Sequence, residues 1–239
     1  AAILGSRSRL ALAAAYLFSA LMVIPHAATF PGLFAPGGLL GAGPQSTAWL
    51  YMYWHAGFPL LVIGYVRLKR RDRLQGALLG SPHLAIAWTV AATIAAVVAF
   101  TALATAGHDV LPAIMRVDHY TPIMRFVVGS VWAASVAALL VLWRQRPHSV
   151  LDLWLMVVMC AWFFDIALSA VLNAGRFDLG FYAGRIYGLC AASFVLLVLL
   201  LETRALYARL IRSVSAERAE AARRADSLEL RVQQETRSL

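Results

Sequence analysis

The chain has 239 residues, 61% of them hydrophobic, and its mean hydropathy is +0.72. A soluble domain has about 45–50% apolar residues, so this composition excludes an ordinary soluble protein and indicates a membrane protein. The formal net charge of +9 would also suit nucleic acid. Basic residues in a membrane protein usually set its orientation, however, so we expect no nucleic-acid partner.

Six apolar segments are long enough to cross a bilayer, which requires about 20 residues. They cover 10–29, 47–66, 84–106, 124–143, 151–172 and 185–206. We therefore predict an all-α membrane protein with six transmembrane helices, in which 1–206 form the transmembrane domain and 207–239 a cytoplasmic helix. Asp152 begins the fifth segment, and we expect it to be structural because a carboxylate near a helix N-terminus is favourable.

Basic residues mark alternate connections between these segments. The second connection has five Lys and Arg residues within 67–73, the fourth has Arg144 and Arg146, and the first, 30–46, has none. Cytoplasmic loops carry the excess of Lys and Arg, so the basic connections face the cytoplasm. Six spans then leave both termini in the cytoplasm, and we expect a multi-pass protein of the bacterial inner membrane.

Four ionisable side chains fall in or near one layer in the outer half of the membrane. They are His26, His55, Asp165 and Arg185. At about 1.5 Å rise per residue, Asp165 lies roughly 21 Å from the inner end of its span, and His55 lies at a similar depth. An ionisable group inside a span is costly unless it is paired or hydrated, so each is a functional candidate.

Two interpretations of this layer remain open. One is a pocket in the outer leaflet. Its predicted ligand-binding residues are His55, Asp165, Arg185, His26, Trp49, Trp54, Arg176 and Tyr187. The other is a belt of interfacial aromatic residues with a structural ion pair between Asp165 and either Arg185 or Arg176.

The histidines also leave room for a cofactor. His26 and His55 lie at positions from which two imidazoles could serve as axial haem ligands. No CxxCH or HExxH motif and no close pair of histidines supports this. Bound haem or quinone stays open as an alternative, and the sequence predicts no metal site and no catalytic residue.

The last part of the chain has the pattern of a signalling helix. No proline or glycine occurs from 189 to 239, which predicts one continuous helix. A heptad pattern with Ile211 at position a predicts a parallel homodimer, whose seam is formed by Ile211, Val214, Ala221, Leu228 and Val232 and interrupted by Arg218 and Glu235. A single solvated helix with chance periodicity is the alternative. The pattern is still running at Leu239, so we expect an output domain beyond it.

Two segments, STAWLYMYWHAGFPL and GRFDLGFYAGRIYG, resemble membrane-associated sensor (MASE) domains, closest to the fourth type. The resemblance covers the six predicted spans, and SLELRVQQETRSL resembles the helix that precedes an output module. It implies the N-terminal sensor of a bacterial histidine kinase, in a two-component system, or of a diguanylate cyclase. It supplies no catalytic residues, because no kinase or cyclase motif is present.

We therefore expect a sensor domain that detects a small apolar or amphipathic molecule in the outer half of the membrane. The dimeric helix would pass the signal to the output domain. A membrane redox protein that binds haem or quinone and a small transporter are the alternatives. Transporters often contain internal repeats, and no paired half-repeats are found here.

Overall fold

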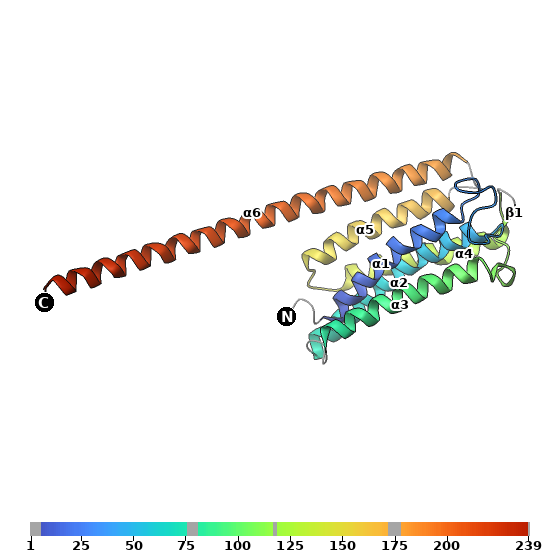
Figure 1. Cartoon of the computed structure of the whole chain (residues 1–239). Coiled ribbons are helices and arrows are strands. Elements are labelled where there is room, and N and C mark those ends of the chain that lie inside the picture. Colours follow the sequence, from blue (N-terminus) through green and yellow to red (C-terminus); the bar gives the residue numbers. More distant parts are fainter. Residues whose placement is uncertain (1–5, 76–80, 117–118, 172–177, 239) are drawn as a thin grey trace. The chain divides into compact units, whose positions relative to one another are not determined.

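The computed structural model describes residues 6–75, 81–116, 119–171 and 178–238, and it is helical almost throughout (Figure 1). The α-helices are α1 (Arg7–Ala28), α2 (Ser46–Gln75), α3 (Pro82–Ala104), α4 (Pro122–Arg144), α5 (Val150–Ile166) and α6 (Leu179–Ser238). A π-helix, η2 (Ala167–Val171), follows α5 directly, and η1 (His108–Val110) is a short 3-10 helix. The predicted helical fold is confirmed. The strands found among the described residues are a short antiparallel pair, β1 (Met115–Arg116) with β2 (His119–Tyr120).

Helix α2 is the centre of the bundle, because it contacts α1, α3, α4 and α5. Its fully buried residues include Leu50 near one end and Val62 and Tyr65 nearer the other. The α1–α2 contact is especially close at Gly57, where an added Cβ would lie 2.2 Å from the ring of Phe18. A side chain at this position would force the two helices apart.

Four helices are long and apolar enough to cross a membrane: α1, α3, α4 and the continuous segment Val150–Val171. On α3, apolar side chains such as Leu84, Trp88 and Val98 are 60% or more exposed. An apolar surface of this extent is expected against lipid tails rather than water. The second and sixth predicted spans lie in α2 and α6, which are not among these four, so the six-span topology stays a prediction.

The chain divides into two compact units, Ala1–Leu189 and Cys190–Leu239. In the second unit, Ile211 and Val214 are 66% and 38% exposed in the single chain. The side chains of Ala221, Leu228 and Val232, the other predicted seam residues, lie outside the described part of the structure, although α6 runs through them. The coiled coil and the domain boundary at residue 206 stay predictions.

One buried carboxylate fastens α5 to α2. Asp152 is only 1% exposed; it accepts a hydrogen bond from the Tyr65 hydroxyl at 2.8 Å and forms an ion pair with Lys69. Asp152 also accepts from the backbone N–H of Ser149, whose own side chain caps the start of α5. Asp152 thus has the expected structural role at the N-terminus of α5, and in addition it contacts α2.

A second carboxylate fastens α2 to the start of α1. Asp72 accepts hydrogen bonds from the Ser6 hydroxyl and the Ser8 backbone N–H, both at 2.9 Å. It lies beyond the apolar part of α2. Burial raises the pKa of the Asp72 carboxyl, but hydrogen bonds from Ser8 and Ser6 outweigh this effect, so the net pKa is below its usual value.

Candidate functional site

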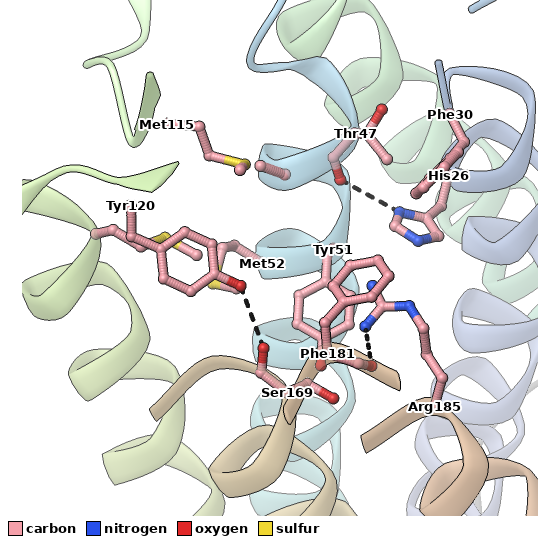
Figure 2. Close-up of a pocket in the computed structure, with 12 residues that line it drawn as sticks. His26, Phe30, Thr47, Tyr51, Met52, Met115, Tyr120, Ser169, Phe181 and Arg185 are labelled. Atoms are coloured by element: carbon pink, nitrogen blue, oxygen red, sulfur yellow. Dashed lines mark hydrogen bonds between the residues drawn. The ribbon is translucent and has the colours of Figure 1, made fainter. Parts of the chain in front are cut away.

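A pocket lies where the end of α1, the start of α2 and the end of η2 meet (Figure 2). It contains about 370 Å³ of empty space, including its open mouth. Its lining comes from seven elements and one loop position: His26, Phe30, Thr47, Ala48, Tyr51, Met52, Met115, Tyr120, Met124, Ser169, Phe181 and Arg185. In the predicted topology this is the outer end of the bundle.

Arg185 supplies the positive charge of the pocket. Its guanidinium lies over the ring of Phe181 at 3.4 Å and over the ring of Tyr51 at 5.8 Å, and it donates to the Phe181 carbonyl at 3.2 Å. Within the described residues, no carboxylate lies within 4.0 Å of it. Two aromatic rings and one carbonyl balance the positive charge of the guanidinium only in part. Arg185 can therefore donate hydrogen bonds to an anion or a neutral acceptor that enters the pocket.

The other side chains of the pocket combine polar groups with an adaptable apolar wall. His26 Nδ1 lies 3.2 Å from the Thr47 carbonyl, which can only accept, so this nitrogen carries a proton. The Tyr120 hydroxyl donates to the Ser169 carbonyl at 3.2 Å. Met52, Met115 and Met124 form much of the apolar wall. Methionine is flexible and polarisable, so such a wall fits ligands of irregular shape.

The side chain of Gln45 holds β1 and β2 at the pocket. The side-chain oxygen of Gln45 accepts from the backbone N–H groups of Ile114 and Met115, at 3.0 and 2.8 Å. Met115 pairs with Tyr120 across the two strands, so both side chains reach the pocket. The indole N–H of Trp49 supports the same loop by donating to the Pro112 carbonyl at 3.2 Å.

His55 and Asp165 form a hydrogen-bonded pair next to the pocket. His55 Nε2 lies 3.0 Å from Asp165 Oδ2, and His55 Nδ1 lies 2.8 Å from the Tyr51 carbonyl. The histidine is 2% exposed. Because the carbonyl can only accept, Nδ1 carries a proton. The remaining proton is then shared between Nε2 and the carboxyl, as imidazolium with carboxylate or as imidazole with carboxylic acid.

Tyr51 connects this pair to the pocket. Its ring stacks on the His55 ring with 3.8 Å between centroids, and it also lines the pocket beneath Arg185. The pair touches α6 as well, because a Cβ added at Gly188 would lie 3.0 Å from Asp165 Oδ1. Arg185 and Gly188 are three residues apart, so the pocket and the pair both meet the same turn of α6.

The predicted site residues are therefore distributed over several places. Of those named from the sequence, His26 and Arg185 line the pocket, and His55 and Asp165 form the adjacent pair. Trp49, Trp54 and Tyr187 do not line it: Trp54 packs edge-on against Trp162, and Tyr187 against Phe164. Arg176 lies outside the described residues. In the described part of the chain, Asp165 pairs with His55 rather than with Arg185.

Several lining residues were not predicted from the sequence. Tyr51 lies one helical turn before His55, and this spacing could have identified it. Ser169, in the π-helix, and Tyr120, in a connection, carry no sequence pattern that marks them.

The hydrogen bonds of His55 bear on whether this residue could ligate haem. Both ring nitrogens of His55 face protein acceptors, which does not fit an axial haem ligand. Among the described residues, no group of three or more His, Cys, Asp and Glu side chains is placed to hold a metal ion.

Comparison with known protein families identifies the family of this chain. The model of the family MASE4, a membrane-associated sensor and integral membrane domain, matches residues 5–207. No curated protein and no solved structure matches the chain.

Proposed function

Because the chain belongs to the MASE4 family of membrane-associated sensors, we propose that the pocket at Arg185 is where this membrane-integral sensor domain meets its signal. The proposed signal is a small amphipathic molecule that enters from the outer half of the membrane. Binding changes the position of α6, which carries the change toward a cytoplasmic output domain of the histidine kinase or diguanylate cyclase type.

One observation carries this proposal: Phe181 and Arg185, which line the pocket, belong to the first turns of α6. A ligand held there contacts the same helix that continues to Ser238. Conformational coupling requires that a ligand interact differently with two arrangements of a movable element. Direct contact with α6 allows a ligand to favour one position of that helix over another without an intermediate relay.

The lining supports the proposed chemistry of the ligand. Arg185 offers a cationic donor, and the hydroxyl of Tyr120 and the ring of His26 are polar. Met52 and Met124 face the same space and suit an apolar tail. A ligand with an anionic or carbonyl head and a short apolar body uses both kinds of surface, whereas a simple inorganic ion uses only one.

The test compares Arg185→Gln with Arg185→Lys. The protein is purified in mild detergent, and the small amphiphiles that copurify are extracted and identified by mass spectrometry. We expect Arg185→Gln to lose the bound species by about tenfold or more, and Arg185→Lys to retain part of it, since a hydrogen bond to a charged group contributes about 1.5–3 kcal/mol.

The matched control is Arg204→Gln, which removes the same charge from an exposed position of α6 outside the pocket. It should leave the copurifying species unchanged. The signalling arm joins the domain to a histidine kinase of known output, in which Arg185→Gln should abolish the response to the identified amphiphile. Equal retention by Arg185→Gln and the wild type would contradict the proposed site.

A further inference from the structure

A groove rich in arginine lies between α2 and the end of α4, at the opposite end of the bundle from the pocket. It contains about 890 Å³ of empty space, including its open side. The lining residues are Val66, Arg67, Arg70, Arg73, Val141, Arg144, Gln145 and Arg146. Five of the eight are arginines and none is acidic, so the groove concentrates positive charge.

This charge is not neutralised within the described part of the protein. Arg73 donates to the backbone carbonyls of Arg146 and Pro147, at 3.5 and 3.3 Å, and none of the five arginines forms an ion pair there. The two carboxylates at this end are already engaged, since Asp72 holds the start of α1 and Asp152 pairs with Lys69. Like charges so close together repel one another, so an anion in the groove would stabilise it.

Setting the membrane orientation does not require this arrangement. The orientation rule asks only for Lys and Arg near the ends of spans. Here Arg67, Arg70 and Arg73 recur every three residues, which places them along one side of α2. Arg144, at the end of α4, and Arg146, just after that helix, line the same groove. The planar guanidinium also binds phosphate through two parallel hydrogen bonds, which an ammonium group does not match.

The groove also has an apolar wall that points to a lipid. Val66 and Val141 line it beside the arginines. Leu140, one turn before Arg144 on α4, is 43% exposed, so the apolar surface continues along the helix. Gln145 adds a polar feature, because its buried side-chain oxygen has no hydrogen-bond partner among the described residues. A hydroxyl group on the headgroup would supply the donor that this oxygen lacks.

We propose that this groove binds a phosphodiester anion, and that its source is the headgroup of an anionic phospholipid that carries a hydroxyl, such as a phosphoglycerol lipid. Basic pockets between membrane helices on the cytoplasmic side are suited to such headgroups. The leaflet follows from the predicted topology, but the site itself depends neither on that topology nor on the pocket at Arg185. Lipid at this position joins α2 to α4 and stabilises the bundle.

The test measures thermal unfolding of the whole protein in a neutral detergent. Phosphatidylglycerol is titrated in one arm, phosphatidylcholine in a second, and the soluble phosphodiester glycerophosphoglycerol in a third. We expect phosphatidylglycerol to raise the unfolding temperature, and the other two to have little effect at the same concentration. If glycerophosphoglycerol acts equally well, the groove binds a phosphodiester but its ligand is a soluble molecule, and the assignment to a lipid is wrong. If phosphatidylcholine acts equally well, the proposal is wrong.

Variants then locate the effect. The double change Arg70→Gln with Arg144→Gln removes one arginine from each side of the groove, and we expect about a tenfold or greater loss of apparent affinity for phosphatidylglycerol, since each basic residue at an anionic membrane surface contributes about 1 kcal/mol. Arg70→Lys with Arg144→Lys keeps the charge and should lose less. Both positions are exposed, so neither pair should prevent folding.

The matched control is Arg71→Gln with Arg209→Gln, which removes the same charge from exposed positions outside the groove. An equal loss of affinity in this control would mean diffuse attraction rather than a site, and would overturn the proposal. Amphiphile binding at Arg185 should be the same in all these variants, so failure of this inference and failure of the proposed function give different results.

Discussion

At the scale of single residues, the His55–Asp165 pair explains how an acid and a base are tolerated inside an apolar bundle. Each ring nitrogen of His55 faces an oxygen, at 2.8 and 3.0 Å, so no polar atom of the ring is left without a partner. Burying a charge alone is costly, but one proton shared between the two side chains keeps the pair as a whole neutral. The pair therefore supports the packing of α2 on α5. The Tyr51 ring, which stacks on His55 and lines the pocket, lies between the pair and the pocket.

The pair can be tested by two substitutions of similar size. In Asp165→Asn, the amide N–H can donate to neutral His55 Nε2, so we expect little loss of stability. In Asp165→Leu, that nitrogen is left buried without a partner, and the free energy of unfolding should fall by about 1–3 kcal/mol. Thermal unfolding in detergent measures both changes, with signalling of the kinase fusion as the second readout.

If Asp165→Asn and Asp165→Leu are equally unstable, the pair is held by charge, as imidazolium with carboxylate, and not by the shared hydrogen bond. If Asp165→Asn folds normally but no longer signals, the carboxyl acts on the ligand or on α6. Normal stability and normal signalling in both variants would remove any role for Asp165.

The residue scale is also where prediction from the sequence reached its limit. Depth along the helices correctly placed His55 and Asp165 near one another, because 1.5 Å per residue fixes height in a bundle of parallel axes. Height does not give rotation about each axis, however. The sequence could therefore not show that Asp165 faces His55 while Arg185 faces the rings of Tyr51 and Phe181.

At the scale of elements, the contact between α1 and α2 has a built-in dependence on pH. Asp72 holds the first turn of α1 through Ser6 and Ser8, and its pKa is lowered in the folded protein. A lowered pKa means that the folded state favours the ionised carboxyl. This contribution to stability is complete above the unfolded pKa of about 3.9, and it is lost as the pH falls through the lower pKa of the folded state.

Asp72→Ala should therefore lower stability at neutral pH by about 0.5–2 kcal/mol, which is the usual effect of removing a helix cap. The difference from the wild type should stay constant from about pH 5 to 8 and shrink below about pH 4, as the Asp72 carboxyl becomes protonated first in the unfolded and then in the folded protein. Thermal unfolding across this pH range measures it. Glu217→Gln, at an exposed position of α6, is the control. A difference between Asp72→Ala and the wild type that does not change with pH would argue against a contribution from the ionised Asp72 carboxylate.

Hydropathy predicted the helices well where lipid requires an apolar run, and less well at their ends. The segment 124–143 corresponds to α4 at Pro122–Arg144, because both the span and the helix end at the basic flank. Helix α2 continues to Gln75, past the predicted end of its span at 66, because its last turns are polar yet still form helix. The π-helix at 167–171 could not be predicted, because a π-helix depends on packing against neighbouring elements and no sequence period marks it.

At the scale of the whole molecule, the proposed parallel homodimer concerns α6. Ile211 and Val214 are apolar and exposed in the single chain, at heptad positions a and d. A seam of this kind is stable only when a second helix covers it. In the predicted topology both copies leave the membrane on the same side, so their α6 helices are expected to run in parallel.

Cysteine crosslinking tests this assembly in membranes. Ile211→Cys and Val214→Cys should each crosslink to the same position of the partner chain several-fold more than Glu220→Cys, which lies at a heptad position away from the seam. The pattern should repeat seven residues later, at Arg218→Cys, because it follows the heptad. Equal crosslinking at all four positions would mean that α6 has no defined seam.

The glycines of α6 have a mechanical consequence for the domain. A Cβ at Gly184 would lie 2.0 Å from the Ser169 hydroxyl oxygen, and Gly188 approaches Asp165 in the same way, so α6 meets its neighbour through bare backbone at two positions four residues apart. At these two positions α6 has no side chain of its own that must repack when the helix makes a small axial slide or rotation. Two positions of the helix can then have similar free energies, and a ligand with only tenfold preference for one would raise its population from about 50% to about 90%.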